Sequence, residues 1–157
     1  MKWTKNLLIA TLLTLSLLLG ACGESDSSGV SKKYQEQLIE LSSENKGNTD
    51  LITKLFEELV EDSNLIYNMT FTESYEEKIN EYSVSLRSLE FTPKTERDKE
   101  IDKLVEDVVS MHLQTNGATL FYLQDKTDHS FNHLTKKINK LTEAVKEFLE
   151  LKKEYEV

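Results

Sequence analysis

Apolar residues recur at alternating spacings of four and three near the C-terminus, and this repeat constrains the fold more than any other feature of the sequence. Its members are Leu134, Ile138, Leu141, Val145 and Phe148. Such a spacing places every member on one face of an α-helix. A single helix of this kind gains most of its stability by burying that face against other helices, so the repeat predicts a helical bundle.

A second clean repeat lies in the middle of the chain and stops shortly before the only proline, Pro93, with the members Tyr75, Ile79, Tyr82, Leu86 and Leu89. Capping-box patterns at Thr70 and Ser74 predict that the chain kinks or restarts a helix near Thr70. Pro93 suits the first turn of the following helix, whose apolar face extends to Tyr122. Asn116 and Gly117 interrupt that face, and glycine there either marks a close helix contact or lets the helix bend or end.

Two helices are expected before this repeat. Apolar residues at spacings of four and three predict a short helix over residues 31 to about 44, and the polar stretch 42–48 is expected to end it. Thr49 or Asp50 can cap a longer helix, whose broad apolar stripe ends near Asn68.

Composition agrees with an all-α fold. The chain has five glycines and one proline. Strands would need more turn residues and more β-branched or aromatic alternation. Short connections between long periodic segments imply antiparallel neighbours. We therefore expect residues 31–157 to form one domain, an up-and-down antiparallel bundle of about four long helices with a short N-terminal helix.

The start of the chain has the layout of a secretory signal. Two lysines precede an apolar run over residues 7–19, and the small residues Gly20 and Ala21 then precede Cys22. The apolar run is shorter than the roughly 20 residues that a membrane-spanning helix needs. Cys22 is the only cysteine, so no intramolecular disulfide can form.

The tetrad Leu19-Gly20-Ala21-Cys22 resembles the lipobox of bacterial lipoproteins. The resemblance implies that residues 1–21 are a cleaved signal peptide and that Cys22 carries diacylglycerol and palmitate on the extracytoplasmic face of the cell membrane. The two acyl chains of the diacylglycerol would by themselves anchor the chain stably, which a single acyl chain cannot do. The small polar residues 23–29 predict a flexible tether over residues 22–30. Beyond this motif the chain resembles, in pattern only, small helical Gram-positive lipoproteins of unknown function.

Charge excludes one class of partner. The formal net charge is −9, and it becomes −11 when Lys2 and Lys5 leave with the signal. Because nucleic-acid phosphates are bound by dense Lys and Arg surfaces, a nucleic-acid partner is not expected. Acidity also keeps small exported domains in solution, so it does not by itself imply a cationic partner.

One group of residues could bind a divalent metal. His129 and His133 are four positions apart, and Asp125 lies one turn earlier, so all three would share a face of a continuous helix. In the competing interpretation a helix begins within residues 127–130, which leaves Asp125 in a loop and the histidines on the surface. His112 lies on an apolar helix face and is expected to be a hydrogen-bonded core residue. We expect no cofactor.

Other signals for chemistry are weaker still. Acidic runs follow the polar faces of two helices, with the members Glu57, Glu58, Glu61, Asp62, Glu73, Glu76 and Glu77. They have the spacing of a solvated helix surface. No nucleophile elbow, phosphate-binding loop or dinucleotide-binding pattern occurs, and enzyme activity is not expected. Phe121 and Tyr122 are adjacent, so one of them is expected to be exposed and available to a partner.

These observations favour a membrane-anchored, non-catalytic lipoprotein that acts by contact with another envelope protein, a cell-wall component or its own copies. A narrower alternative is an exclusion, immunity or inhibitor lipoprotein of a mobile element. A third is a metal or small-ligand carrier that uses His129 and His133. The chain is too short for the two-lobed binding subunit of an importer.

Overall fold

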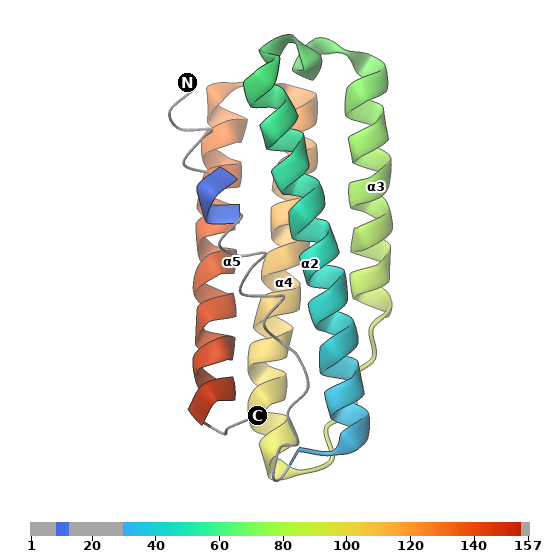
Figure 1. Cartoon of the computed structure of the whole chain (residues 1–157), viewed down its shortest axis with the longest axis vertical. Coiled ribbons are helices and arrows are strands. Elements are labelled where there is room, and N and C mark those ends of the chain that lie inside the picture. The colour runs from blue at the N-terminus through green and yellow to red at the C-terminus, as the bar shows by residue number, and fades with distance from the viewer. Residues whose placement is uncertain (1–8, 13–29, 155–157) are drawn as a thin grey trace.

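The computed structural model describes residues 9–12 and 30–154, and in this part of the chain it is a helical bundle without β-strands (Figure 1). The expected all-α class is confirmed. Four long helices are joined by short connections, one of which holds a 3-10 helix: α2 (Lys32–Glu61), η1 (Ser63–Tyr67), α3 (Met69–Ser88), α4 (Glu96–Asp125) and α5 (Asp128–Glu154). The predicted signal peptide and tether lie largely outside the described residues.

Helix α2 corrects the sequence prediction, because it runs unbroken through the polar stretch 42–48. Asn45, Asn48 and Thr49 are at most 1% exposed and face the core. The hydroxyl of Thr49 donates to the carbonyl of Asn45 at 2.8 Å, a bond back to the preceding turn that is compatible with a helix interior. The expected short N-terminal helix is therefore the first half of α2. Asn45, Asn48 and Thr49 belong to the buried face of α2, whereas Ser43 and Lys46 are exposed.

The break between α2 and α3 falls near the predicted position but is built differently. Helix α2 ends at Glu61, and η1 follows before α3 begins. The residue that caps α3 is Asn68, whose side-chain oxygen accepts the backbone N–H of Phe71 at 3.1 Å. The predicted capping residue, Thr70, lies inside the first turn. Asn is among the preferred capping residues, so the signal was present two positions earlier.

One prediction for α4 was wrong, and two of the alternatives left open at Gly117 do not occur. Pro93 lies outside the helix, which begins at Glu96 after a capping box formed by Thr95 and Asp98. Helix α4 also runs through Gly117 without ending, and a Cβ atom added there would meet nothing within 4 Å. A close contact occurs instead at Gly47 in α2, where an added Cβ would lie 2.6 Å from the hydroxyl of Tyr82.

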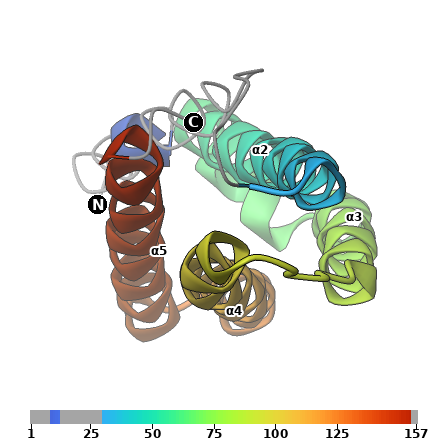
Figure 2. The same ribbon diagram turned by 90° about the horizontal axis from the view of Figure 1, so that it is seen from below.

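The bundle has two distinct ends and one open side (Figures 1 and 2). The start of α2 and the α3–α4 connection lie at the lower end in Figure 1, whereas η1 and the α4–α5 connection lie at the upper end. Helices α4 and α5 pack most extensively, followed by α3 with α4 and α2 with α3. The backbones of α2 and α5 come close to each other at few points, but Phe56 of α2 and Phe131 of α5 meet edge to face with ring centroids 6.0 Å apart. The short helical segment of residues 9–12 lies beside α5, on the side facing α2.

Buried apolar side chains form two clusters. The upper apolar cluster draws on the described N-terminal segment and on every element of the bundle: Leu12, Ile52, Leu55, Phe56, Leu59, Ile66, Tyr75, Ile79, Ala118, Tyr122, Leu123, Phe131, Leu134 and Ile138. The lower apolar cluster lies nearer the start of α2: Val30, Tyr34, Leu41, Leu86, Ile101, Val105, Val108, Leu141, Val145 and Phe148. The heptad positions predicted from α5 are all buried in one or other cluster.

Candidate functional site

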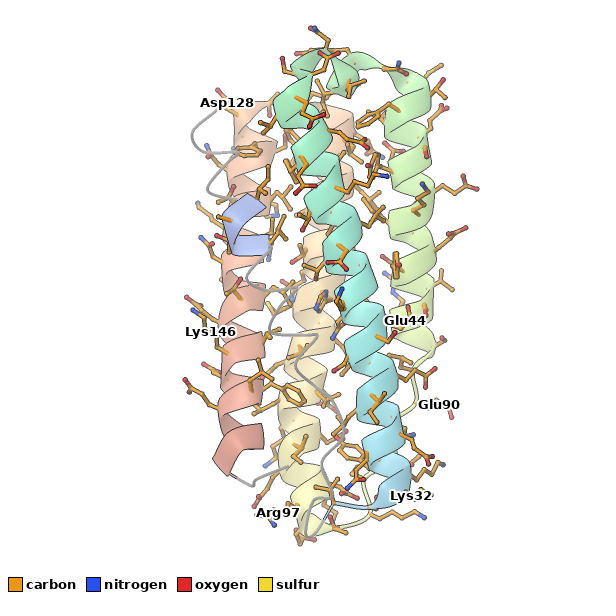
Figure 3. All side chains as sticks on the ribbon, in the orientation of Figure 1. Lys32, Glu44, Glu90, Arg97, Asp128 and Lys146 are labelled. Carbon is orange, nitrogen blue, oxygen red and sulfur yellow. The ribbon has the colours of Figure 1, made fainter. Side chains whose placement is uncertain are left out.

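A buried polar layer separates the two apolar clusters. The side-chain amide of Asn48 in α2 donates to the side-chain oxygen of Asn116 in α4 at 2.7 Å. The amide of Asn116 in turn donates to the hydroxyl of Ser83 in α3 at 2.9 Å. Each of these residues is at most 6% exposed. The layer therefore joins three helices by one chain of hydrogen bonds, and in α2 it lies one turn beyond Glu44, which is labelled in Figure 3.

His112 belongs to the same layer and is fully buried. Its Nδ1 lies 3.5 Å from the side-chain amide nitrogen of Asn48, whereas its Nε2 has no hydrogen-bond partner. Burial lowers the pKa of the imidazole to about 3, so the ring is neutral at physiological pH. The expected core position is confirmed. The side-chain oxygens of Asn45 and Asn48 also lack partners, so the layer is only partly satisfied.

The threonines around this layer satisfy their own hydroxyl groups. Thr49, Thr53, Thr115, Thr119 and Thr142 each donate to the carbonyl four residues earlier, at 2.8–2.9 Å. Such bonds allow a hydroxyl to be buried within a helix without a partner from another helix. Within the layer, no carboxylate accompanies His112. This arrangement suits a structural polar layer better than acid–base catalysis, which needs a paired donor and acceptor at a substrate.

The three residues considered as metal ligands do not share a helix. Lys126 adopts a left-handed conformation with φ of 59° and ends α4 just after Asp125, while His129 and His133 belong to α5. The prediction that all three line one continuous helix is therefore wrong. All three are exposed. Within the described part of the chain, no three His, Cys, Asp or Glu side chains come together in a way that could hold a metal ion.

These residues have simpler roles. The hydroxyl of Thr127 donates to the carboxylate of Asp125, which lowers the pKa of that carboxyl. The ring of His133 meets that of Phe121 edge to face, with centroids 6.3 Å apart. Phe121 is 42% exposed and Tyr122 only 3%, so the expectation that one of these neighbouring aromatics is exposed is confirmed.

Most of the acidic side chains singled out in α2 and α3 lie on the surface. Glu58 is half-buried: it accepts the hydroxyl of Tyr75 at 3.0 Å, and Lys54 lies 3.8 Å away. That hydrogen bond joins α2 to α3. These carboxylates therefore behave as parts of helix surfaces.

The upper end of the bundle carries the most exposed apolar side chains among the described residues. Tyr67 is 72% exposed and Met69 is 70% exposed, and they flank the connection between η1 and α3. The ammonium group of Lys126 lies 5.9 Å from the centroid of the Tyr67 ring, a cation–π contact that brings the α4–α5 connection to the same place. We call Tyr67, Met69 and Lys126 the tip surface. Exposed aromatic and Met side chains are typical of contact sites.

A groove of about 510 Å³ lies between α2 and α3. Gly47 allows Tyr82 to approach α2 closely, so this tyrosine, which was expected in the core, is only half-buried in the groove wall. The remaining lining combines Leu51 and Ser85 with charged side chains of both signs, Glu44, Asp50, Lys54, Lys78 and Glu81. Ligand pockets usually enclose most of the surface of a ligand, whereas this groove is open to solvent.

Comparison of the chain with protein-family models, with curated proteins and with solved structures gives no match. In residues 9–12 and 30–154, no helix is both long enough and apolar enough to cross a bilayer.

Proposed function

We propose that this protein is a membrane-anchored, non-catalytic lipoprotein whose helical bundle acts by contact with another envelope protein through the tip surface. The observation that carries the proposal is the position of Tyr67 and Met69, which are highly exposed where η1 meets α3, and this junction lies at the end of the bundle opposite the start of α2 (Figure 1). Val30 is the first described residue of the domain and follows the lipobox and the polar tether in the sequence.

The length of the bundle indicates what such an anchor would achieve. Helix α2 has 30 residues and is therefore about 45 Å long, at about 1.5 Å per residue. An anchor at Cys22 would hold the start of α2 near the bilayer and place the tip surface on the far side of the domain. Confinement to the membrane also raises the effective concentration of the tip relative to neighbouring proteins, which favours a protein that works by contact.

The chemistry of the tip also supports contact. Large apolar side chains that are about 70% exposed cost solvation unless they are covered part of the time. The other exposed aliphatic residues, Ile39 and Val84, stand alone on helix surfaces. Exclusion, immunity or inhibition would each be a form of such contact, and the tip would be the surface that meets the target.

Site-specific cross-linking would test the proposal. The full chain would carry a photoreactive amino acid at Tyr67 and, as a matched control, at Val84, which is 65% exposed on α3. We expect a discrete cross-linked protein from position 67 in native cells and none from position 84. Equal products from both positions, or no product from position 67, would contradict the contact function.

The anchor needs a test of its own. Cys22→Ser in the full chain should abolish labelling by radioactive palmitate and leave an uncleaved precursor, whereas the parent chain should be labelled and shortened by 21 residues. Labelling of the serine variant, or cleavage at another site, would refute the assignment of the lipobox.

A further inference from the structure

The open side of the bundle is covered by part of the apolar run at the start of the chain. Leu12 is 0% exposed and belongs to the upper apolar cluster, and Ile9, three positions earlier, is half-buried against the same cluster. Residues 9–12 are helical. The segment lies beside α5, on the side where the backbones of α2 and α5 stand apart and are bridged by the contact between Phe56 and Phe131.

Removal of residues 1–21 would uncover this side. The cluster that contains Leu12 includes Ile52, Leu55, Phe56 and Leu59 from α2, and Phe131, Leu134 and Ile138 from α5. We call these seven residues the α2–α5 face. Side chains of this kind form apolar patches that bind partners when they are exposed together.

We propose that in the processed protein the α2–α5 face receives an apolar α-helix of a partner protein, whose two aliphatic side chains three positions apart take the places of Ile9 and Leu12. This inference rests on the removal of residues 1–21 that the proposed function includes. Helix-in-groove recognition uses aliphatic anchors at this spacing. The seated segment Ile9–Ala10–Thr11–Leu12 carries no charge and thus defines the chemistry of the partner helix.

The described domain offers no such helix to a second copy of itself. Its exposed large apolar residues are Ile39, Tyr67, Met69, Val84 and Phe121, and no two of them stand three or four positions apart. Other described aliphatic residues with this spacing, such as Val109 and Leu113, are at least half-buried against its own core. A partner helix from another protein is therefore the occupant that the observations favour.

A peptide binding experiment can test this directly. The probe is a fluorescent peptide of residues 7–19 with lysines added at its C-terminus for solubility. The two receptors are the processed chain, residues 22–157 with Cys22→Ser, and the full chain with the same substitution. We expect the processed chain to bind the peptide and the full chain to bind it at least about tenfold more weakly, because its own residues 9–12 compete at high effective concentration.

Leu12 provides matched controls in both molecules. A Leu12→Asp peptide should lose at least about tenfold in affinity, since it would bury a carboxylate in place of an aliphatic side chain. Leu12→Asp in the full chain should open the face and restore binding of the parent peptide. Equal binding by the full and processed chains, or equal binding of both peptides, would overturn the proposal.

Three further outcomes would also contradict it. If the processed chain shows no cooperative thermal transition, its folding requires residues 9–12, which would then be a permanent part of the core. Concentration-dependent dimers that exclude the peptide would assign the face to a second copy, and displacement of the peptide by palmitate would assign it to an acyl chain. Tyr67→Ala should leave peptide binding unchanged. Loss of the cross-link at position 67 with peptide binding intact would therefore refute the proposed function alone.

Discussion

The upper apolar cluster and the polar layer are adjacent and exclude water equally well, but different interactions hold them together. Leu134 and Ile138 in the cluster are at most 1% exposed and pack through carbon contacts alone. In the layer, Asn48 and Asn116 form hydrogen bonds, while three buried polar atoms have no partner. Apolar burial stabilises the fold, whereas partly satisfied polar burial costs free energy.

The polar layer compensates for this cost in free energy because it fixes how the helices are aligned with one another. Aliphatic seams with a repeating spacing can pack in more than one register, because each turn resembles the next. The bond from Asn48 to Asn116 and the bond from Asn116 to Ser83 form only when α2, α3 and α4 have one relative height. Buried polar residues are known to set helix register at some cost in stability. We infer that stability comes mainly from the clusters and alignment from the layer.

The largest effect should come from the apolar cluster. Leu134→Ala should lower the free energy of unfolding by about 2–5 kcal/mol, since it removes buried methyl groups and leaves a cavity. Chemical denaturation followed by circular dichroism measures this loss. Val84→Ala, at an exposed position, is the control and should change stability by less than about 0.5 kcal/mol. A loss at Leu134 as small as that would show that the cluster is loosely packed.

A smaller loss is expected in the layer. Asn116→Ala removes the acceptor of Asn48 and the donor of Ser83, and it should cost about 1–3 kcal/mol. If alignment depends on this residue, the variant should also broaden the amide resonances of α2 and α3 in NMR spectra. Sharp, native-like spectra would separate stability from alignment and contradict the role we assign to the layer.

Asp98 is a buried polar residue with several hydrogen-bond donors, in contrast to the partly satisfied polar layer. It allows the contribution of such bonds to the free energy of unfolding to be measured. Burial alone would raise the pKa of this carboxyl, but bonds from the backbone of Lys94, from the side chain and backbone of Ser31 and from the backbone of Thr95 lower it to about 2. Because the folded-state pKa lies below the unfolded value of 3.8, the contribution is present above pH 4 and is lost as pH falls towards 2.

We expect this contribution to be about 1–2 kcal/mol. The measurement is the free energy of unfolding of the parent chain and of Asp98→Asn between pH 6 and pH 2. The difference between the two should shrink as the pH falls below 4. A difference that stays constant over this range would mean that the Asp98 carboxylate does not titrate with folding.

The smallest effect, with the opposite sign, is expected at His112. His112→Leu removes the unpartnered Nε2 atom and adds apolar surface of similar size, so stability should stay the same or rise by up to about 1 kcal/mol. Thermal unfolding at neutral pH measures it. A clear loss would indicate that the weak contact with Asn48 matters more than its 3.5 Å distance implies.

The sequence predicted the elements with aliphatic repeats well and the polar ones poorly. The seam of α5 was correct at every position, whereas in the repeat of α3 Tyr75, Ile79 and Leu86 are buried and Tyr82 and Leu89 only half-buried. Repeated aliphatic residues on one helix face are a strong signal because their burial is the main source of stability. The continuity of α2 was missed because Asn45, Asn48 and Thr49 were interpreted as a polar break. Together with Leu41, Ile52 and Thr53 they follow the same helical spacing, and this periodicity was the available signal.

The candidate sites were harder to predict for a physical reason. The spacing of apolar residues along the helix assigns Tyr122 to the buried face, so the exposure of its neighbour Phe121 could be predicted. The layer that joins Asn48, Ser83 and Asn116 depends on the relative heights of three helices, which one sequence does not encode locally. The contact of Leu12 with the upper apolar cluster likewise joins residues far apart in the chain.

The bonds between Ser31 and Asp98 have a mechanical consequence. In a chain anchored as we propose, a pull along the tether reaches the fold at Val30, which is buried in the lower apolar cluster. It then reaches Ser31, whose backbone N–H and hydroxyl donate to Asp98 at 3.0 and 2.8 Å. Asp98 in turn belongs to the capping box of α4. Force on the tether would therefore be transmitted to α4 and to its extensive contact with α5. Helix α2 could separate from α4 only after the hydrogen bonds between Ser31 and Asp98 had broken.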